Sequence, residues 1–145
     1  EKKGTKRHLL VDERGIPLSL VVSGANLNDF KAVDSVLRSI RIHGPRPGRG
    51  HSQQHLCGDK GYDQAITRET VAARGYTAHI RSRGEEKKAL VRKPGVRARR
   101  WVVEACHSWL NRFRKLLVRF EKTECSAMGL LELACAIICW RRADV

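Results

Sequence analysis

Two acidic residues occupy positions where a carboxylate can take part in a reaction. Asp59 directly follows a short apolar segment, residues 55–58, which the sequence predicts to be a buried strand. In open α/β sheets, ligands gather at the carboxyl ends of such strands. Glu104 lies in a segment with the apolar period of an amphipathic helix. Each acid also has an ordinary structural role open to it, Asp59 as a turn former and Glu104 as the helix-surface partner of Arg100.

Taken together, the two carboxylates indicate a magnesium site. Mg²⁺ prefers carboxylate oxygens and keeps several of its waters. Two such ions about 4 Å apart can activate a water or a 3′-hydroxyl and stabilise the leaving oxygen of a phosphodiester. This chemistry needs few acids on rigid elements and a basic surround that holds nucleic acid. Asp59 on a strand and Glu104 on a helix fit that plan, provided that they converge in space.

The chain is strongly basic, with 29 Lys and Arg residues against 15 Asp and Glu and a formal net charge of +14. The surplus is concentrated in residues 81–119, which hold thirteen basic and three acidic residues and so supply +10 of the total. A stripe of this density fits a phosphate backbone better than a small anion. The alternative is a basic surface that is merely solvated.

Length and composition exclude several other classes of protein. With 145 residues, 41% of them hydrophobic, the chain is expected to form one packed domain, residues 1–145. No apolar run reaches the roughly 18 to 20 residues of a membrane-spanning helix, and no signal-peptide pattern opens the chain. Five cysteines without an export signal indicate reduced thiols. We therefore expect a cytoplasmic protein with a polyanionic partner and no membrane partner.

Apolar periodicity predicts an α/β fold in which helices cover a mixed sheet. The strands are expected at residues 8–11, 18–22, 55–58 and 76–80. The helices are expected at residues 30–40, 63–73, 98–121 and 127–142. The first two strands form a hairpin whose turn contains Gly15, and Asp63 and Gly75 are placed to begin and end the second helix. Residues 81–99 are expected to be a basic loop.

A zinc site is a weaker hypothesis. His51, His55 and Cys57 lie in or beside a loop rich in glycine, but structural zinc normally needs four nitrogen or sulfur ligands. Cys135 and Cys139 lie on an apolar helix, where buried thiols are the simpler explanation.

The aromatic residues near Glu104 also have two interpretations. Aromatic rings can stack on nucleic-acid bases. Trp109 and Phe113, however, fall on the apolar stripe of the predicted helix, which favours core packing. Trp101 lies off that stripe, and a position facing a DNA groove stays open for it.

Three segments, in order along nearly the whole chain, resemble the DDE transposases of bacterial insertion sequences. The opening Gly4-Thr5-Lys6-Arg7-His8-Leu9-Leu10-Val11-Asp12 is similar to the hairpin that follows the family's first aspartate. The second segment, Asp59-Lys60-Gly61-Tyr62-Asp63, resembles the motif of the second aspartate. The third begins Arg100-Trp101-Val102-Val103-Glu104 and is similar to the segment that bears the third acid.

This resemblance implies a ribonuclease-H-like fold that cuts and joins DNA at the ends of a transposable element with two Mg²⁺ ions, for which Mn²⁺ can substitute. Asp59 would be the second catalytic acid and metal ligand, and Glu104 the third. The implied partners are double-stranded DNA, at the transposon ends and the target, and a second copy of the chain, in the bacterial nucleoid. DNA contacts are expected from Lys60, Arg97, Arg99, Arg100, Arg112, Arg114 and Lys115.

The chain also departs from the family's pattern. The family's first catalytic aspartate lies on a central strand upstream of the hairpin, and this chain starts after that position. Asp12 is no substitute because it lies in a turn. We therefore expect a mixed sheet truncated at its N-terminus, without its first central strand, and an isolated chain that does not transpose. Such a chain is a truncated copy, a fragment, or a second reading frame whose upstream product supplies the first aspartate.

Two further interpretations stay open. One is a non-catalytic, basic DNA-binding remnant with the same fold. The other is a ribonuclease-H-like nuclease of another kind, which the transposase-like residues around Glu104 disfavour.

Overall fold

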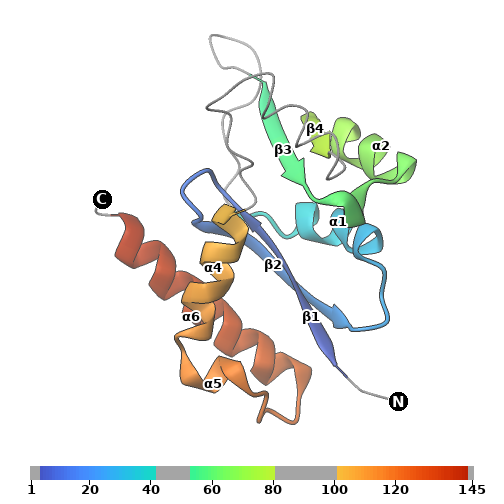
Figure 1. Ribbon diagram of the computed structural model, residues 1–145. Helices are drawn as coiled ribbons and strands as arrows, with labels where there is room; N and C mark the ends of the chain where they lie inside the picture. The colour runs from blue at the N-terminus through green and yellow to red at the C-terminus, as the bar shows by residue number, and fades with distance from the viewer. Residues whose placement is uncertain (1–3, 42–52, 81–100, 144–145) are drawn as a thin grey trace.

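The computed structural model describes residues 4–41, 53–80 and 101–143. Strands and helices alternate in the first two thirds of the chain, and helices alone make up the last third (Figure 1). In chain order the elements are β1 (Thr5–Val11), β2 (Pro17–Gly24), α1 (Asp29–Arg38), β3 (Gln54–Gly58), the 3₁₀ turn η1 (Lys60–Tyr62), α2 (Ala65–Ala73), β4 (Tyr76–Ile80), α4 (Trp101–Asn111), α5 (Arg114–Leu117) and α6 (Glu124–Ala143).

The hairpin of β1 and β2 is antiparallel and lies between two groups of helices (Figure 1). Its turn is fixed by Asp12, whose carboxylate accepts two backbone N–H hydrogen bonds, each of 2.8 Å. Gly15 has a φ angle of 82°, which favours glycine, and a Cβ at this position would lie only 3.2 Å from the Trp109 ring. The predicted hairpin and its glycine turn are thus confirmed.

Alternate residues of the hairpin face opposite groups of helices. Leu10 packs on a hydrophobic cluster formed by α1 and α2, while its neighbour Leu9 packs on a second cluster formed by the C-terminal helices. α1 is anchored to β2 by the Ser19 hydroxyl, which donates a 2.7 Å hydrogen bond to the carbonyl of Val36. The first cluster consists of Val33, Leu37, Ile40 and Val71.

β3 and β4 form a parallel pair connected through η1 and α2. A helix between two parallel strands is the ordinary crossover connection. α2 packs on β4, with Thr67 and Val71 buried. Gly75, whose φ angle is 82°, follows the helix and lets the chain turn into β4, as the sequence predicts.

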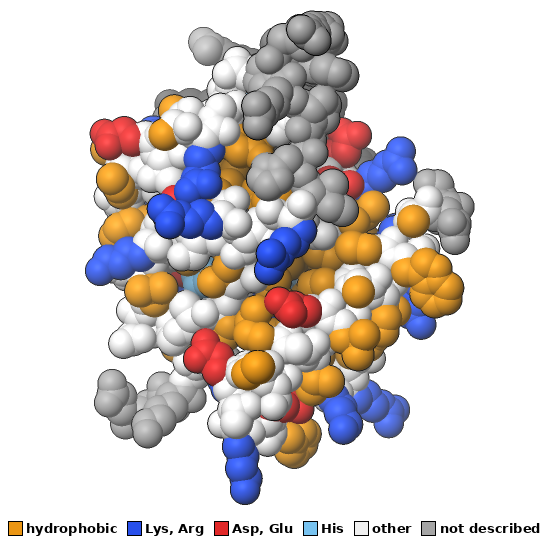
Figure 2. All heavy atoms as spheres, turned by 180° about the vertical axis from the view of Figure 1, so that it is seen from behind, with side chains coloured by type: hydrophobic (Ala, Val, Ile, Leu, Met, Phe, Trp, Pro, Cys, Tyr) orange, Lys and Arg blue, Asp and Glu red, His pale blue; other side chains and the backbone are white. Residues whose placement is uncertain are grey.

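α6 has one buried and one exposed apolar side. Leu131, Ala134 and Ile138 are buried. Leu133 and Trp140 on the same helix are 58% and 73% exposed. Figure 2, which views the molecule from behind, shows many hydrophobic side chains exposed on this face.

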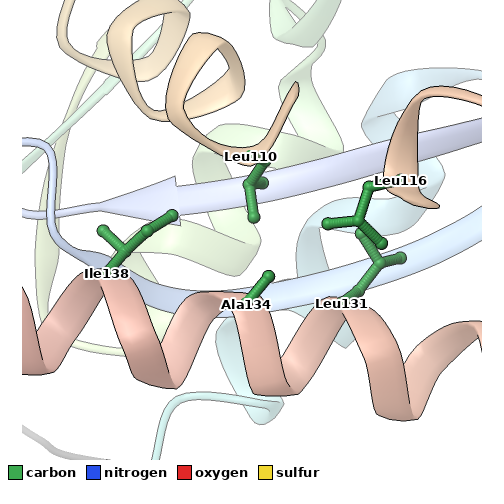
Figure 3. Close-up of a cluster of buried hydrophobic side chains, with 5 residues drawn as sticks. All are labelled: Leu110, Leu116, Leu131, Ala134 and Ile138. Carbon is green, nitrogen blue, oxygen red and sulfur yellow. The ribbon is translucent and has the colours of Figure 1, made fainter. Parts of the chain in front are cut away.

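The C-terminal cluster joins all three helices after residue 100. Leu110 of α4 and Leu116 of α5 point toward Leu131, Ala134 and Ile138 of α6 (Figure 3). Leu110 is completely buried. This cluster fixes α4, and with it Glu104, against the hairpin.

The expected helix over residues 98–121 is wrong in its extent. α4 ends at Asn111, and Phe113 takes an extended conformation before the single turn of α5. Arg7 of β1 donates hydrogen bonds to the Asn111 side chain, at 3.3 Å, and to the carbonyl of Leu116. After the break, Leu116 lies in the hydrophobic cluster with Leu131 of α6. The last expected helix, residues 127–142, is confirmed as α6, which begins three residues earlier.

Three smaller expectations have different outcomes. Asp63 does not cap α2; Gln64 holds the N-cap position, and Asp63 instead accepts a 2.7 Å hydrogen bond from Arg68. The described strands form two separate pairs, β1–β2 and β3–β4, where one mixed sheet is expected. The basic loop 81–99 lies outside the described residues.

No helix in the described ranges has the length and apolar character needed to cross a membrane.

Candidate active site

Asp59 lies at the carboxyl end of β3, as predicted, and its side chain is exposed. It caps η1: the backbone N–H of Gly61 donates a 2.9 Å hydrogen bond to Asp59 Oδ1. Gly61 is needed here for space, since a Cβ on it would lie 3.1 Å from that oxygen. The turn therefore holds one carboxylate oxygen through the backbone at the surface of the molecule.

Asp29, at the start of α1, brings a second carboxylate to the same turn. The Cβ position of Gly61 would lie 3.3 Å from Asp29 Oδ2. Lys6 of β1 forms a 3.1 Å ion pair with Asp29 Oδ1 and donates a 2.9 Å hydrogen bond to the carbonyl of Leu27. β1, α1 and η1 thus meet around these two acids.

The pKa of the Tyr62 hydroxyl is affected by both carboxylates. Burial raises the pKa of its hydroxyl to about 12, and the negative charges of Asp29 and Asp59 act in the same direction. Asp29 is not among the site residues predicted from the sequence, so this cluster was missed. Lys6 and Asp29 are 23 residues apart in the sequence, so no local pattern connects them.

Glu104 lies in the first turn of α4 and is exposed. Val102, Cys106 and Leu110 are the buried residues of this helix, so Glu104 points away from the core. α4 packs on β1 and α6, whereas Asp59 belongs to the turn beside α1. Both acids are open to solvent, as metal ligands that meet DNA must be, and their convergence stays a prediction.

The donor chemistry of these two acids suits a hard divalent cation. Mg²⁺ binds through one or two carboxylates while keeping waters and substrate phosphate oxygens as its other ligands. Within the described residues, no group of three or more His, Cys, Asp or Glu side chains is arranged to hold a metal. The carboxylate oxygens of Asp59 and Glu104 suit Mg²⁺ by their chemistry, and their joint binding of one ion stays a prediction.

The other metal-binding residue types have structural roles. His55 and His79 are joined by a 2.8 Å hydrogen bond between ring nitrogens, and His51 lies outside the described residues. Burial raises the pKa of the Cys106 thiol to about 12 and that of Cys135 to about 11, so both thiols stay protonated. All five cysteines are free of disulfides.

The expected DNA-binding residues are divided between two places. Lys60 is exposed on η1, next to Asp59. Arg112, Arg114 and Lys115 are exposed at the break between α4 and α5. Arg97, Arg99 and Arg100 lie outside the described residues.

The aromatic residues near Glu104 differ in how far they are buried. Trp109 and Phe113 pack against the C-terminal cluster, as the apolar stripe predicts, while Trp101 is 55% exposed. The guanidinium of Arg142 lies over the Trp109 ring, 3.9 Å from its centroid. Sequence reasoning missed Arg142, because it lies at the far end of the chain from the predicted site.

Comparison with known proteins identifies the family. The family model described as the transposase DDE domain matches residues 56–141, a segment that includes both Asp59 and Glu104. A protein of Burkholderia cepacia that is named as a transposase for insertion sequence element IS402 is 37% identical over 150 residues. The chain therefore belongs to the DDE-domain transposase family.

Two relatives show how much of a curated sequence this chain covers. The alignment with the Burkholderia cepacia protein spans 99% of this chain and 67% of that protein. A Brucella ovis protein named as a transposase for insertion sequence element IS6501 is 28% identical over 139 residues, which are 95% of this chain and 98% of that protein. No solved structure matches the chain significantly.

Proposed function

We propose that this chain carries the second and third catalytic acids of a transposase that cleaves DNA at transposon ends and transfers the cut strand to a target. The observation that carries this proposal is the exposed Asp59 carboxylate, held by a backbone N–H at the end of β3, in a chain of the DDE-domain family. Glu104, exposed on α4 within the matched segment, is the third acid.

The fold proposed for the complete enzyme is ribonuclease-H-like. In it, the pairs β1–β2 and β3–β4 belong to one mixed sheet, with a further central strand between them that bears the first aspartate. An upstream segment or a separate upstream reading-frame product would supply that strand. The separation of the two strand pairs in the described residues supports this arrangement.

Asp59 and Glu104 would hold Mg²⁺, or Mn²⁺ in its place. The bound ions supply Lewis acidity at the attacking and leaving oxygens of the phosphodiester. The residues of this chain would orient the metal ligands and bind the DNA. The backbone N–H of Gly61 fixes one oxygen of Asp59, and basic side chains neutralise DNA phosphates. The proposed phosphate contacts are Lys60, Arg97, Arg99, Arg100, Arg112, Arg114 and Lys115.

The alternative function is DNA binding without catalysis. It is favoured by the net charge of +14 and by the exposed basic side chains at the break between α4 and α5, which can bind phosphates without a metal ion. Because the family's chemistry uses three acids, we expect the isolated chain to bind duplex DNA but not to cut it.

Transposition also requires two element ends to be brought together, so we propose that the complete protein acts as a homodimer at the nucleoid.

A strand-transfer assay tests catalysis. With Mg²⁺ and linear DNA that carries the element's ends, we expect no joined product from the isolated chain and clear product from a polypeptide completed upstream. In the completed protein, Asp59→Asn or Glu104→Gln should lower product formation at least about 100-fold. Glu69→Gln, which changes an exposed acid of α2, should leave it unchanged.

The same variants separate the two functions. If Glu104→Gln removes cleavage but not duplex binding, the catalytic proposal holds. A completed protein that binds DNA tightly without cutting it would support the remnant instead. Replacing Arg114 and Lys115 with alanine should weaken duplex binding and flatten its salt dependence by about one unit per lost phosphate contact.

A further inference from the structure

A cavity of about 350 Å³ opens where the end of α4 meets the end of α6. Its volume falls in the lower part of the roughly 300–1,000 Å³ range of small-ligand sites. No described lining residue is acidic. The lining consists of Trp109, Arg112, Phe113, Ile138, Arg141 and Arg142.

The positive charges of this cavity are not neutralised by any acidic residue in the described parts of the chain. Arg112 and Arg141 form no ion pair with any described residue. Arg142 is used differently, since its guanidinium lies 3.9 Å from the centroid of the Trp109 ring. Three guanidinium groups around one hollow repel one another, so an anion bound there would remove a cost. Planar guanidinium groups match phosphate oxygens in pairs.

The cavity also presents aromatic surface. Trp109 and Phe113 line it beside the charges, and Ile138 adds an apolar side chain. The six-membered ring of Trp109 also lies close to the Gly15 turn, where an added Cβ would be 3.2 Å from it. Base-on-aromatic stacking contributes about 1–3 kcal/mol per base and tolerates any base.

We propose that this cavity binds a nucleotide, with its phosphate held by Arg112 and Arg141 and its base against Trp109 and Phe113. A free 5′-mononucleotide and a nucleotide of a DNA strand share this chemistry. The DNA source rests on the proposed function and deepens it, because it adds a place for an unpaired nucleotide near the strand to be cut. The site lies outside the expected metal ligands and needs no catalysis to be tested.

The test uses the fluorescence of Trp109 in the full chain. Trp101 and Trp140 are exposed and are replaced by phenylalanine, so that Trp109 is the remaining tryptophan. The probe is thymidine 5′-monophosphate, titrated at low salt. We expect saturable quenching by this nucleotide and at least tenfold weaker binding of thymidine, which lacks the phosphate.

Charge-matched double variants separate a site from general electrostatic attraction. Arg112→Ala with Arg141→Ala should weaken nucleotide binding at least tenfold. Lys31→Ala with Arg41→Ala removes the same charge from exposed positions outside the cavity and should change binding less than twofold. All four side chains are exposed, so both variants should stay folded, which circular dichroism and thermal unfolding confirm. Equal weakening in the two variants, or no quenching in the parent protein, would overturn the proposal.

Two further binding experiments, one with a single-stranded oligonucleotide and one with blunt duplex DNA, identify the source of the nucleotide. If the source is a DNA strand, the cavity variant should weaken binding of a single-stranded oligonucleotide at least tenfold and that of blunt duplex much less. If it is a free nucleotide, mononucleotide binding should weaken at least tenfold, while single-stranded and duplex DNA binding should weaken equally and only by the loss of the Arg112 phosphate contact. Loss of all duplex binding by the parent chain would contradict the proposed function alone, since mononucleotide binding is measured separately.

Discussion

At the residue scale, the candidate site depends on the small size of Gly61. Gly61 leaves room for the carboxylates of Asp59 and Asp29, one on each of two elements. Lys6 neutralises part of this negative charge from β1. The cluster lies at the end of β3, so the position of Asp59 depends on three segments that are distant in sequence.

Replacing Gly61 with alanine should therefore disturb this cluster. The added methyl would press on two carboxylate oxygens at 3.1 and 3.3 Å, and we expect a loss of about 1 kcal/mol in the free energy of unfolding. Gly129→Ala on α6 is the matched control, since its Cβ meets nothing within 4 Å and should stabilise the helix by about 0.5–1 kcal/mol. Urea unfolding measures both, and shifts of the same sign would contradict the packing described for Gly61.

Two histidines predict a pH dependence of stability. Burial lowers the pKa of His8 below 6.5, and burial together with the charge of Arg7 lowers that of His107. Because the unfolded chain binds these protons more readily, their contribution is complete above about pH 6.5 and is lost as the pH falls below it. Thermal unfolding should therefore occur at a lower temperature at about pH 5.5 than at pH 7.5. Replacing both histidines with glutamine should reduce that difference, and an unchanged difference would exclude this cause.

At the element scale, the C-terminal helices are fixed by a small core. Leu110 is completely buried between α4 and α6, whereas Leu117 of α5 is 59% exposed. We expect Leu110→Ala to lower the free energy of unfolding by about 2–5 kcal/mol, and Leu117→Ala to change it by less than about 0.5 kcal/mol. Chemical denaturation measures the difference, and similar effects for the two leucines would contradict the core of Figure 3.

Periodicity predicts most of the elements because it reports which face of each segment is buried. The hairpin, α1, β4 and α6 follow it closely, whereas β3 forms where expected but contains no buried residue. The break after Asn111 escapes such reasoning, because apolar residues continue at helical spacing through Phe120. The break coincides with a long-range contact, the hydrogen bonds from Arg7 to the α4–α5 segment, which no local pattern contains.

The candidate site divides in the same way. Asp59 and Glu104 are predicted from the sequence because the segments around them resemble the family's motifs, although each acid alone has an ordinary structural role open to it. Asp29 and Arg142 are not, since their importance arises from residues far along the chain, Gly61 and Trp109.

At the scale of the whole molecule, the hairpin separates two hydrophobic clusters. Asp59 begins the turn η1, which contacts α1, and Glu104 lies on α4, which packs on β1 and α6. The proposed chemistry requires that one metal ion reach both acids. The net charge of +14 favours DNA over the whole surface, but it does not by itself bring the acids together.

Titration of the isolated chain with Mn²⁺, followed by nuclear magnetic resonance of the backbone amides, tests this convergence most directly. The paramagnetic ion broadens signals of nearby residues. We predict that Gly61 and Ala105, the neighbours of the two acids, broaden together at the same Mn²⁺ concentration, and that Asp59→Asn suppresses both effects. Broadening of Gly61 while Ala105 stays sharp, or an Ala105 signal that ignores Asp59→Asn, would contradict a shared metal site.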